Sequence, residues 1–406
     1  MPATQPLPSN LRPVREKALD ALKEVQPAGP PRSNTEAKAL FFASRTDAGR
    51  HLPEYYLVYF LLVDLLQYPS LGQWEKVAWS IPIRYKDRLY SIEHRKFGIG
   101  VFAPSHDPNA RMSTNPSYDD EIDSAEIVCA IKKAISIATP YFEWLASEAA
   151  STHQINVTNK STELYERYIY FRDQFRLLLD NANKQKDEAR FKKWSLPNAS
   201  DPTLEAATKT ASRFEAICNA QAAIEAFFAW TEHLFIHIAI LQGGLLTGED
   251  VATLAKANWG DKFKAAIDMT PCKMKQHYDR LLSLRTQVRN FMAHGAFGKN
   301  GEAFEFHSGA GSVPILLSSQ PKSRYAFTGG SIFDEETAIA DIEAFVEYLW
   351  KGKYSPAKTY IFSGLPSTLT FAVDGSYKRA MQSDEEMMEF VEYLEHQVDR
   401  SANMDW

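Results

Sequence analysis

Apolar residues recur along most of this chain at steps of three and four positions, the spacing of a buried helix face. In the segment 161–193 they follow heptad spacing, which predicts a long bundle helix. In the segment 204–241 they cover nearly every direction around the axis, which predicts a central, buried helix. The helices expected from these patterns are 52–68, 118–150 (kinked or split at Pro140), 161–193, 204–241, 250–257, 261–267, 276–294, 333–351 and a last one beginning at Ser383.

Alternation of apolar and polar residues, the mark of a strand, is confined to two regions of the chain. Trp79, Ile81 and Ile83 alternate, residues 86–88 turn, and residues 89–92 return, so a β-hairpin is expected. Further short strands are expected at 97–102, 303–306, 313–318 and 324–328. The predicted fold class is therefore mainly α: a helical bundle, an N-terminal helical region with a small β-hairpin, and short strands late in the chain.

Composition predicts four parts along the chain. Residues 1–35 hold many of the prolines and are expected to be a mobile leader, with room for a short helix at 17–25. A turn-rich stretch then separates a mainly helical region, 36–200, from a helical domain at 201–352. Residues 353–406 are expected to be a C-terminal extension. Its last helix is expected to be acidic, since residues 382–406 contain eight acidic residues and one arginine.

The overall composition excludes several classes of protein. The net charge is −6 at pH 7, so no global basic field indicates a nucleic-acid partner, and any such site must be local. Three dispersed cysteines indicate reduced thiols and a cytoplasmic location. The N-terminus lacks a signal-peptide core, and the most apolar run, 55–66, is shorter than the about 20 residues of a membrane span. We expect no membrane association, and the lack of a nucleotide-binding motif predicts no cofactor.

The helix 276–294 ends in three side chains whose chemistry suits phosphate. Gly295 follows its last apolar position and is a good C-terminal stop. At about 100° per residue, Asn290 and His294 lie only about 40° apart, and the adjacent Arg289 is long enough to reach them. Histidine passes protons near neutral pH, arginine offers a planar fork of donors, and asparagine adds one hydrogen bond. In the alternative interpretation, His294 caps its own helix and Arg289 is solvated.

Arg-Asn followed by three residues and His, late in an amphipathic helix and after a long apolar helix, resembles the motif of the HEPN family. The resemblance covers about 203–351 and implies a HEPN-like helical bundle. In that family the motif belongs to metal-independent endoribonucleases, whose two copies meet across a homodimer. The resemblance therefore implies catalytic roles for Arg289, Asn290 and His294, an RNA substrate, and a toxin or phage-defence role with an antitoxin or regulatory partner. The competing hypothesis is a non-catalytic HEPN-like protein that dimerises or binds RNA or a partner.

A local excess of positive charge precedes this motif. Between residues 261 and 290, seven Lys and Arg minus three Asp leave a charge of +4 in an otherwise acidic chain. A phosphate backbone favours such a patch, so the RNA-binding candidates are Lys273, Lys275, Arg280 and Arg285. A solvated helix face explains the same charges equally well.

Three polar side chains, Glu232, His233 and His237, interrupt the apolar helix 204–241. The resemblance implies that Glu232 hydrogen-bonds Arg289 or His294 and so sets its charge or tautomer. Alternatively, all three could bind a metal, but their spacing is not that of zinc proteases and a further ligand is not evident. A structural role is thus favoured, and no metal is expected. His307, in a later strand, is expected to be a surface or packing histidine.

Overall fold

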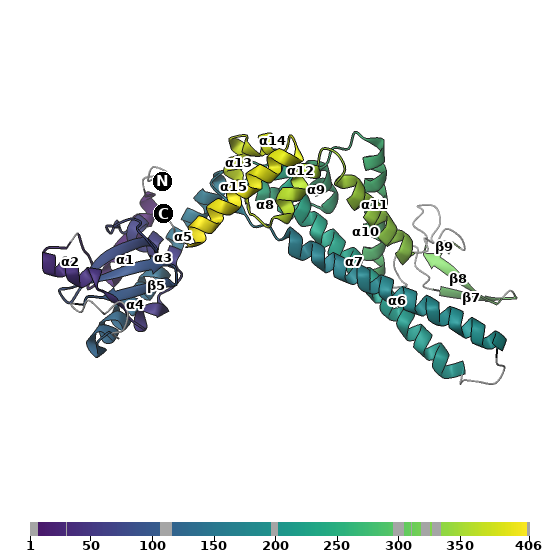
Figure 1. Ribbon diagram of the computed structural model, residues 1–406, viewed down its shortest axis with the longest axis horizontal. Coiled ribbons are helices and arrows are strands. Elements are labelled where there is room, and N and C mark those ends of the chain that lie inside the picture. Colours follow the sequence, from purple (N-terminus) through teal and green to yellow (C-terminus); the bar gives the residue numbers. More distant parts are fainter. Residues whose placement is uncertain are drawn as a thin grey trace. The chain divides into compact units, whose positions relative to one another are not determined.

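A computed structural model gives the fold of this chain, and helices dominate it (Figure 1). Its α-helices are accompanied by small antiparallel sheets, which confirms the mainly α class. The chain forms two compact units: unit 1 is Met1–Ser151 with Tyr393–Trp406, and unit 2 is Thr152–Glu392. The structure describes residues 7–29, 31–105, 116–195, 202–294, 304–309, 311–317, 325–326 and 334–403.

Unit 1 is built around a five-stranded antiparallel sheet with the strand order β1-β3-β4-β5-β2. The predicted hairpin is β3–β4, in which Ile81 lies opposite Ile92, and the predicted third strand is β5. The outer strands are two residues long, so no alternation could reveal them. The strands are β1 (Gln26–Pro27), β2 (Ser44–Arg45), β3 (Val77–Tyr85), β4 (Arg88–Arg95) and β5 (Gly98–Ala103).

One face of this sheet packs against helices and forms the core of unit 1. The expected helix 52–68 is a short α-helix followed by a π-helix, and the predicted break at Pro140 is confirmed by the end of a helix at Ile137. The helical elements are η1 (Ser9–Leu11), α1 (Arg12–Ala21), α2 (Asn34–Phe41), η2 (Ala48–His51), α3 (Tyr55–Tyr59), η3 (Phe60–Leu65), α4 (Tyr118–Ile137) and α5 (Thr139–Ser151).

The expectation of a mobile leader through residue 35 was wrong for residues 7–29. Leu11, Ala18, Leu22 and Val25 are nearly inaccessible to solvent and belong to the core of unit 1. Pro13 stands in the first turn of α1, where the missing N–H breaks no helical hydrogen bond. The prolines therefore flank a docked amphipathic helix, and composition alone did not distinguish this arrangement from a linker.

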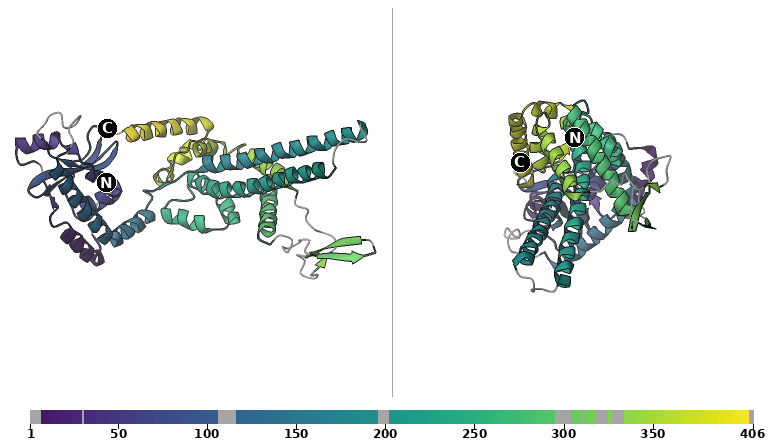
Figure 2. Two further views of the ribbon diagram at one scale, coloured as in Figure 1. Left: turned by 90° about the horizontal axis from the view of Figure 1, so that it is seen from below. Right: turned by 90° about the vertical axis from the view of Figure 1, so that its right-hand side faces the viewer.

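Two long helices, α6 (Ser161–Ser195) and α7 (Pro202–Leu241), dominate unit 2 and run side by side (Figures 1 and 2). The boundary expected near residue 200 lies between them, whereas the two units divide at Ser151. A segment that joins two helices of one unit and a linker between domains can share the same Pro, Asn and Ser composition, which explains the misplacement. The predicted central helix is α7, whose Phe227, Trp230 and Phe235 are completely buried.

The rest of unit 2 packs smaller elements around this helical pair. The three strands expected after residue 302 are confirmed as a small antiparallel sheet. The expected extension 353–406 is not a separate part: Tyr360 and Tyr377 are buried in unit 2, and the last helix continues into residues of unit 1. The elements are β6 (Asn156–Val157), α8 (Gly248–Lys256), α9 (Trp259–Ala266), α10 (Cys272–His294), β7 (Phe304–Ser308), β8 (Gly311–Leu317), β9 (Tyr325–Ala326), α11 (Glu335–Leu349), α12 (Ser355–Phe362), β10 (Ser367–Thr368), α13 (Leu369–Val373), α14 (Ser376–Ala380) and α15 (Asp384–Asn403).

The segment Arg213–Leu241 of α7 is long and apolar enough to cross a membrane, judged by length and composition alone. Of its most apolar window, 72% is buried within the protein. A buried core helix meets the same criteria, so this segment is weak evidence for a membrane span.

Candidate functional site

The predicted motif stands at the C-terminal end of α10. The helix buries Met274, Leu281 and Val288 on one face and runs to His294, as the periodicity predicted. The backbone of Arg289, Asn290 and His294 is therefore helical. Their side chains, and Gly295 beyond them, lie outside the described part of the structure. The described residues nearest to the motif along the helix form the candidate site.

Glu232, in the last third of α7, joins three helices at this site. One of its carboxylate oxygens accepts a hydrogen bond from Lys262 Nζ on α9 at 2.8 Å. The other accepts from Arg285 Nη2 on α10 at 2.6 Å. Burial disfavours the ionised carboxylate, but the bonds from Lys262 and Arg285 outweigh burial and lower the pKa of Glu232. The resulting cluster carries a net charge of about +1 and is called the Glu232 clasp below.

Arg285 is the member of the Glu232 clasp that belongs to the motif helix, one turn before Arg289. Its guanidinium lies over the rings of Phe228 and Trp259, 5.6 Å and 5.9 Å from their centroids. Its Nη1 is buried and has no hydrogen-bond partner among the described residues. Arginine stacked on aromatic rings and bound to a carboxylate is held in one orientation. The clasp therefore fixes α10 at Arg285 against α7 and α9.

Glu232 was expected to pair with Arg289 or His294, and the partners that the structure describes are Lys262 and Arg285. The expectation identified the polar residue and the helix that it faces, but Arg285 lies one turn earlier. Both cations were visible in the sequence as part of the basic stretch. The packing of the helices determines which of these cations pairs with Glu232 of α7. Hydrophobic periodicity does not predict that packing.

The four RNA-binding candidates on α10 have different surroundings. Arg285 is engaged in the Glu232 clasp, and Arg280 bonds to Asp341 of α11 at 2.8 Å. Lys273 is exposed, with its Nζ over the ring of Tyr348, and Lys275 is also exposed. In the basic stretch, the two arginines thus form ion pairs with acids of this chain, and the two lysines face solvent.

His233 and His237 form a hydrogen-bonded chain that ties α7 to β10. His233 Nε2 accepts from the Lys160 backbone N–H at 2.9 Å and lies 3.0 Å from His237 Nε2, so His237 is the donor of that second bond. His237 Nδ1 then accepts from the Ser367 hydroxyl at 2.8 Å. Burial lowers the pKa of His237 to about 3, so this imidazole is neutral near pH 7.

Glu232 is bonded to Lys262 and Arg285, and the two histidines are bonded to each other. These three side chains therefore do not converge on one point. Throughout the residues that the structure describes, no group of three His, Cys, Asp or Glu side chains could hold a metal ion. His307 is exposed on β7, which agrees with the expected surface histidine.

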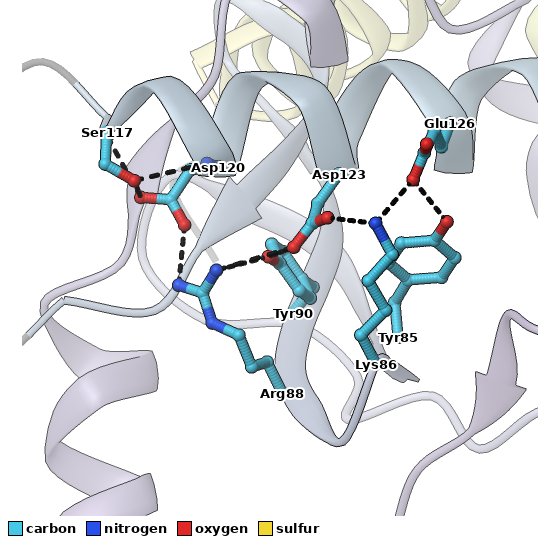
Figure 3. Close-up of polar contacts among 8 residues, drawn as sticks. All are labelled: Tyr85, Lys86, Arg88, Tyr90, Ser117, Asp120, Asp123 and Glu126. Atoms are coloured by element: carbon cyan, nitrogen blue, oxygen red, sulfur yellow. Dashed lines mark hydrogen bonds and ion pairs between the residues drawn. The ribbon is translucent and has the colours of Figure 1, made fainter.

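A second polar cluster, in unit 1, was not anticipated from the sequence (Figure 3). Lys86, in the β3–β4 turn, bonds to Asp123 and Glu126 of α4, at 2.8 Å and 2.7 Å. Its neighbours complete the network: Arg88 bonds Asp120, Tyr90 donates to Asp123, and Tyr85 donates to Glu126. Burial and the bond to Glu126 raise the pKa of Tyr85 to about 12. This network holds the hairpin against α4. In the sequence, the spacing of three between Asp120, Asp123 and Glu126 was the one feature that could have indicated a shared acidic face.

Comparison with protein-family models, with curated proteins and with solved structures finds no match for this chain.

Proposed function

We propose that this chain is a metal-independent endoribonuclease of HEPN type, with its active site at the C-terminal end of α10. The proposal starts from the combination of Arg289, Asn290 and His294 in the last turns of one helix. The observation that carries it further is the Glu232 clasp, because the partly buried ion pair between Glu232 and Arg285 anchors α10 one turn before those side chains. Catalytic groups act best when rigid elements position them.

The proposed reaction is an internal transfer of a phosphodiester. The ribose 2′-hydroxyl loses a proton to a histidine and attacks the adjacent phosphorus, and the bond from phosphorus to the 5′-oxygen breaks. A second histidine protonates that oxygen, so the products are a 2′,3′-cyclic phosphate and a 5′-hydroxyl. His294 takes the proton-transfer roles, Arg289 stabilises the charge of the phosphorane, and Asn290 orients His294 or the phosphate.

The end of α10 also supplies a favourable field for these groups. The C-terminus of a helix carries a partial negative charge, which stabilises an adjacent arginine and the protonated form of an adjacent histidine. A protonated His294 is the species that the leaving oxygen needs. One chain supplies a single motif histidine, so the acid and the base come from two copies in a homodimer. The enzyme thus acts as a dimer on RNA in the cytoplasm.

The biological setting proposed with this activity is that of a toxin or phage-defence effector. An RNase of this kind is held silent by an antitoxin or another regulatory partner until it is triggered. Unit 1, whose sheet and helices form a separate core, is the part available to such a partner.

One observation favours a second candidate function, a non-catalytic protein that dimerises or binds a partner. Tyr170 and Leu177 on α6 and Phe214 on α7 are large apolar residues that are more than half exposed. Tyr170 and Leu177 are seven residues apart and share one face of α6. Exposed apolar side chains on a long hairpin suit a protein interface, which would form with or without catalysis.

Incubation of the wild-type chain with total RNA, in parallel with His294→Ala, tests the proposal. His396→Ala is the matched control, since His396 is an exposed histidine of α15 outside the candidate site. Cleavage by the wild type and the control, but not by His294→Ala, is the expected result. An intact RNA population with all three proteins would favour the non-catalytic function.

A further inference from the structure

A cavity of about 720 Å³ lies in unit 2 among α6, α11, the residues that follow α11, and α12. This volume is within the roughly 300–1,000 Å³ of small-molecule sites in proteins. The residues that line it do not include any from α10, so the cavity is separate from the proposed catalytic end of that helix.

Aromatic side chains form the apolar part of the cavity. The rings of Tyr165 and Phe362 are 5.2 Å apart at 75°, and those of Trp350 and Phe362 are 6.1 Å apart at 71°. All three are only partly buried, so ring surface remains accessible within the cavity. Flat ring systems stack on surfaces of this kind, and nucleobases do so with little dependence on sequence.

The charges around the cavity leave one cation available. Glu343 binds Arg172 and Arg176, and Glu347 binds Lys351. Lys358, exposed on α12, lines the cavity and has no ion-pair partner in the described part of the chain. Glu166, an exposed acid of α6, is likewise unpaired there and can accept a hydrogen bond from an exocyclic amino group. A phosphate is the natural partner of a free lysine at the rim.

We propose that this cavity binds a nucleotide. The base stacks on the rings of Tyr165, Trp350 and Phe362. The phosphate lies at Lys358. A free nucleotide and an unpaired nucleotide of an RNA chain present the same chemistry. The site is independent of RNA cleavage, because its residues are not those assigned to the reaction.

Calorimetric titration of the full-length protein with the four ribonucleoside 5′-monophosphates, with adenosine, and with a 2′-O-methyl oligonucleotide tests the proposal. The 2′-O-methyl groups remove the nucleophile, so the oligonucleotide stays intact. Binding of free monophosphates that Trp350→Leu weakens identifies a nucleotide site in the cavity, and binding of the oligonucleotide alone that Trp350→Leu weakens identifies an RNA subsite there; either result supports the proposal. Oligonucleotide binding that Trp350→Leu leaves unchanged assigns the RNA to the proposed active site on α10 and overturns the proposal. His294→Ala protein should bind equally, so a failure of the proposed ribonuclease leaves this test unaffected.

Two variants and a matched control define the binding mode. Trp350→Leu should weaken binding by about tenfold or more, the scale expected when one stacking ring is lost. Lys358→Ala should weaken binding of the monophosphates while leaving adenosine unchanged. Lys353→Ala, an exposed lysine paired with Asp268 outside the cavity, should bind like the wild type. Thermal melts establish that each variant is folded.

The proposal is overturned if the wild type shows no saturable binding to either ligand class at millimolar concentration. It is overturned equally if folded Lys358→Ala binds the monophosphates as well as the wild type does. Saturable binding of tetramethylammonium that nucleotides fail to displace would assign the cavity to a cationic ligand instead.

Discussion

Glu232 of α7 and Arg285 of α10 are joined by a hydrogen bond of 2.6 Å between Oε1 and Nη2, and the opposite oxygen of Glu232 binds Lys262 of α9. The side chain of Lys262 is only 6% exposed. A single carboxylate thus pairs with two cations on two different helices, and one of them, Arg285, lies one turn before the residues proposed to cleave RNA. Its removal would affect both the stability of unit 2 and the position of the end of α10.

Glu232→Gln should destabilise the protein by roughly 1–3 kcal/mol, because a buried Lys262 would remain without a carboxylate. Urea unfolding at neutral pH measures the change. Asp341→Asn is the matched control: its partner Arg280 is 62% exposed, so that pair should contribute less than about 1 kcal/mol. Equal stability of wild type and Glu232→Gln would show that the clasp does not hold the helices.

The contribution of Glu232 should also depend on pH. The folded state lowers its pKa below the ordinary value of 4.5, so the stabilisation is fully present above that value. It is lost as the pH falls through the lower pKa of the folded state. The difference in unfolding free energy between wild type and Glu232→Gln should therefore shrink in acid, and a difference that grows there would contradict the assigned ion pairs.

His294→Ala should reduce cleavage by about a hundredfold to ten-thousandfold, the usual effect of removing a proton-transfer group. The stability change should stay within about 0.5 kcal/mol, as for a surface position. Arg289→Ala should lose a comparable rate, and Arg289→Lys should recover only part of it because a point charge lacks the fork geometry. If His294 only caps its helix, alanine would instead cost about 1 kcal/mol and leave cleavage intact. Thermal melts and cleavage rates on the same preparations separate these outcomes.

RNA cleavage should persist in a strong chelator. In the proposed mechanism Arg289 supplies the charge that a divalent ion would otherwise supply to the phosphorane. Rates with and without excess chelator on one preparation provide the measurement. Loss of activity that one specific divalent ion restores would rule out the metal-independent mechanism.

The protein should be a homodimer with the two α10 ends facing each other, because the reaction needs an acid and a base. Light scattering gives the mass in solution. In a background with the exposed Cys129, Cys218 and Cys272 replaced by serine, Gln287→Cys should cross-link between subunits on oxidation. Glu385→Cys, exposed at the start of α15, is the control and should stay uncross-linked. A monomer, or a dimer that cross-links only through Glu385→Cys, would contradict the composite site.

Asp87→Gly should stabilise unit 1 by about 1 kcal/mol. Lys86 and Asp87 form the β3–β4 turn with φ angles of 49° and 63°, and such turns favour glycine at the second position. Lys86→Gly relieves similar strain but loses the bonds to Asp123 and Glu126, so it should be less stable than Asp87→Gly. Thermal melts rank the variants, and the opposite order would show that the network in Figure 3 contributes little.

Local periodicity along the sequence was sufficient to predict most of the larger elements. The β3–β4 hairpin, the break at Pro140, the buried α7 and the extent of α10 to His294 all follow from residues close together in the chain. Hydrophobic spacing reports which face of an element is buried, and local turn chemistry reports where an element ends. The placement of Arg289, Asn290 and His294 on the last turns of one helix was therefore determined by the sequence.

Only the tertiary structure determined which residues contact the buried faces of these helices and strands. Glu232 pairs with Lys262 and Arg285, which are 30 and 53 residues away in the chain. His237 bonds to Ser367 across 130 residues, and residues 7–29 dock into a core built largely from later segments. A polar residue in an apolar helix signals that some partner exists, but it does not identify the partner. The identity depends on the rotation and depth at which helices pack, and these are set by the fit of many side chains from distant parts of the chain.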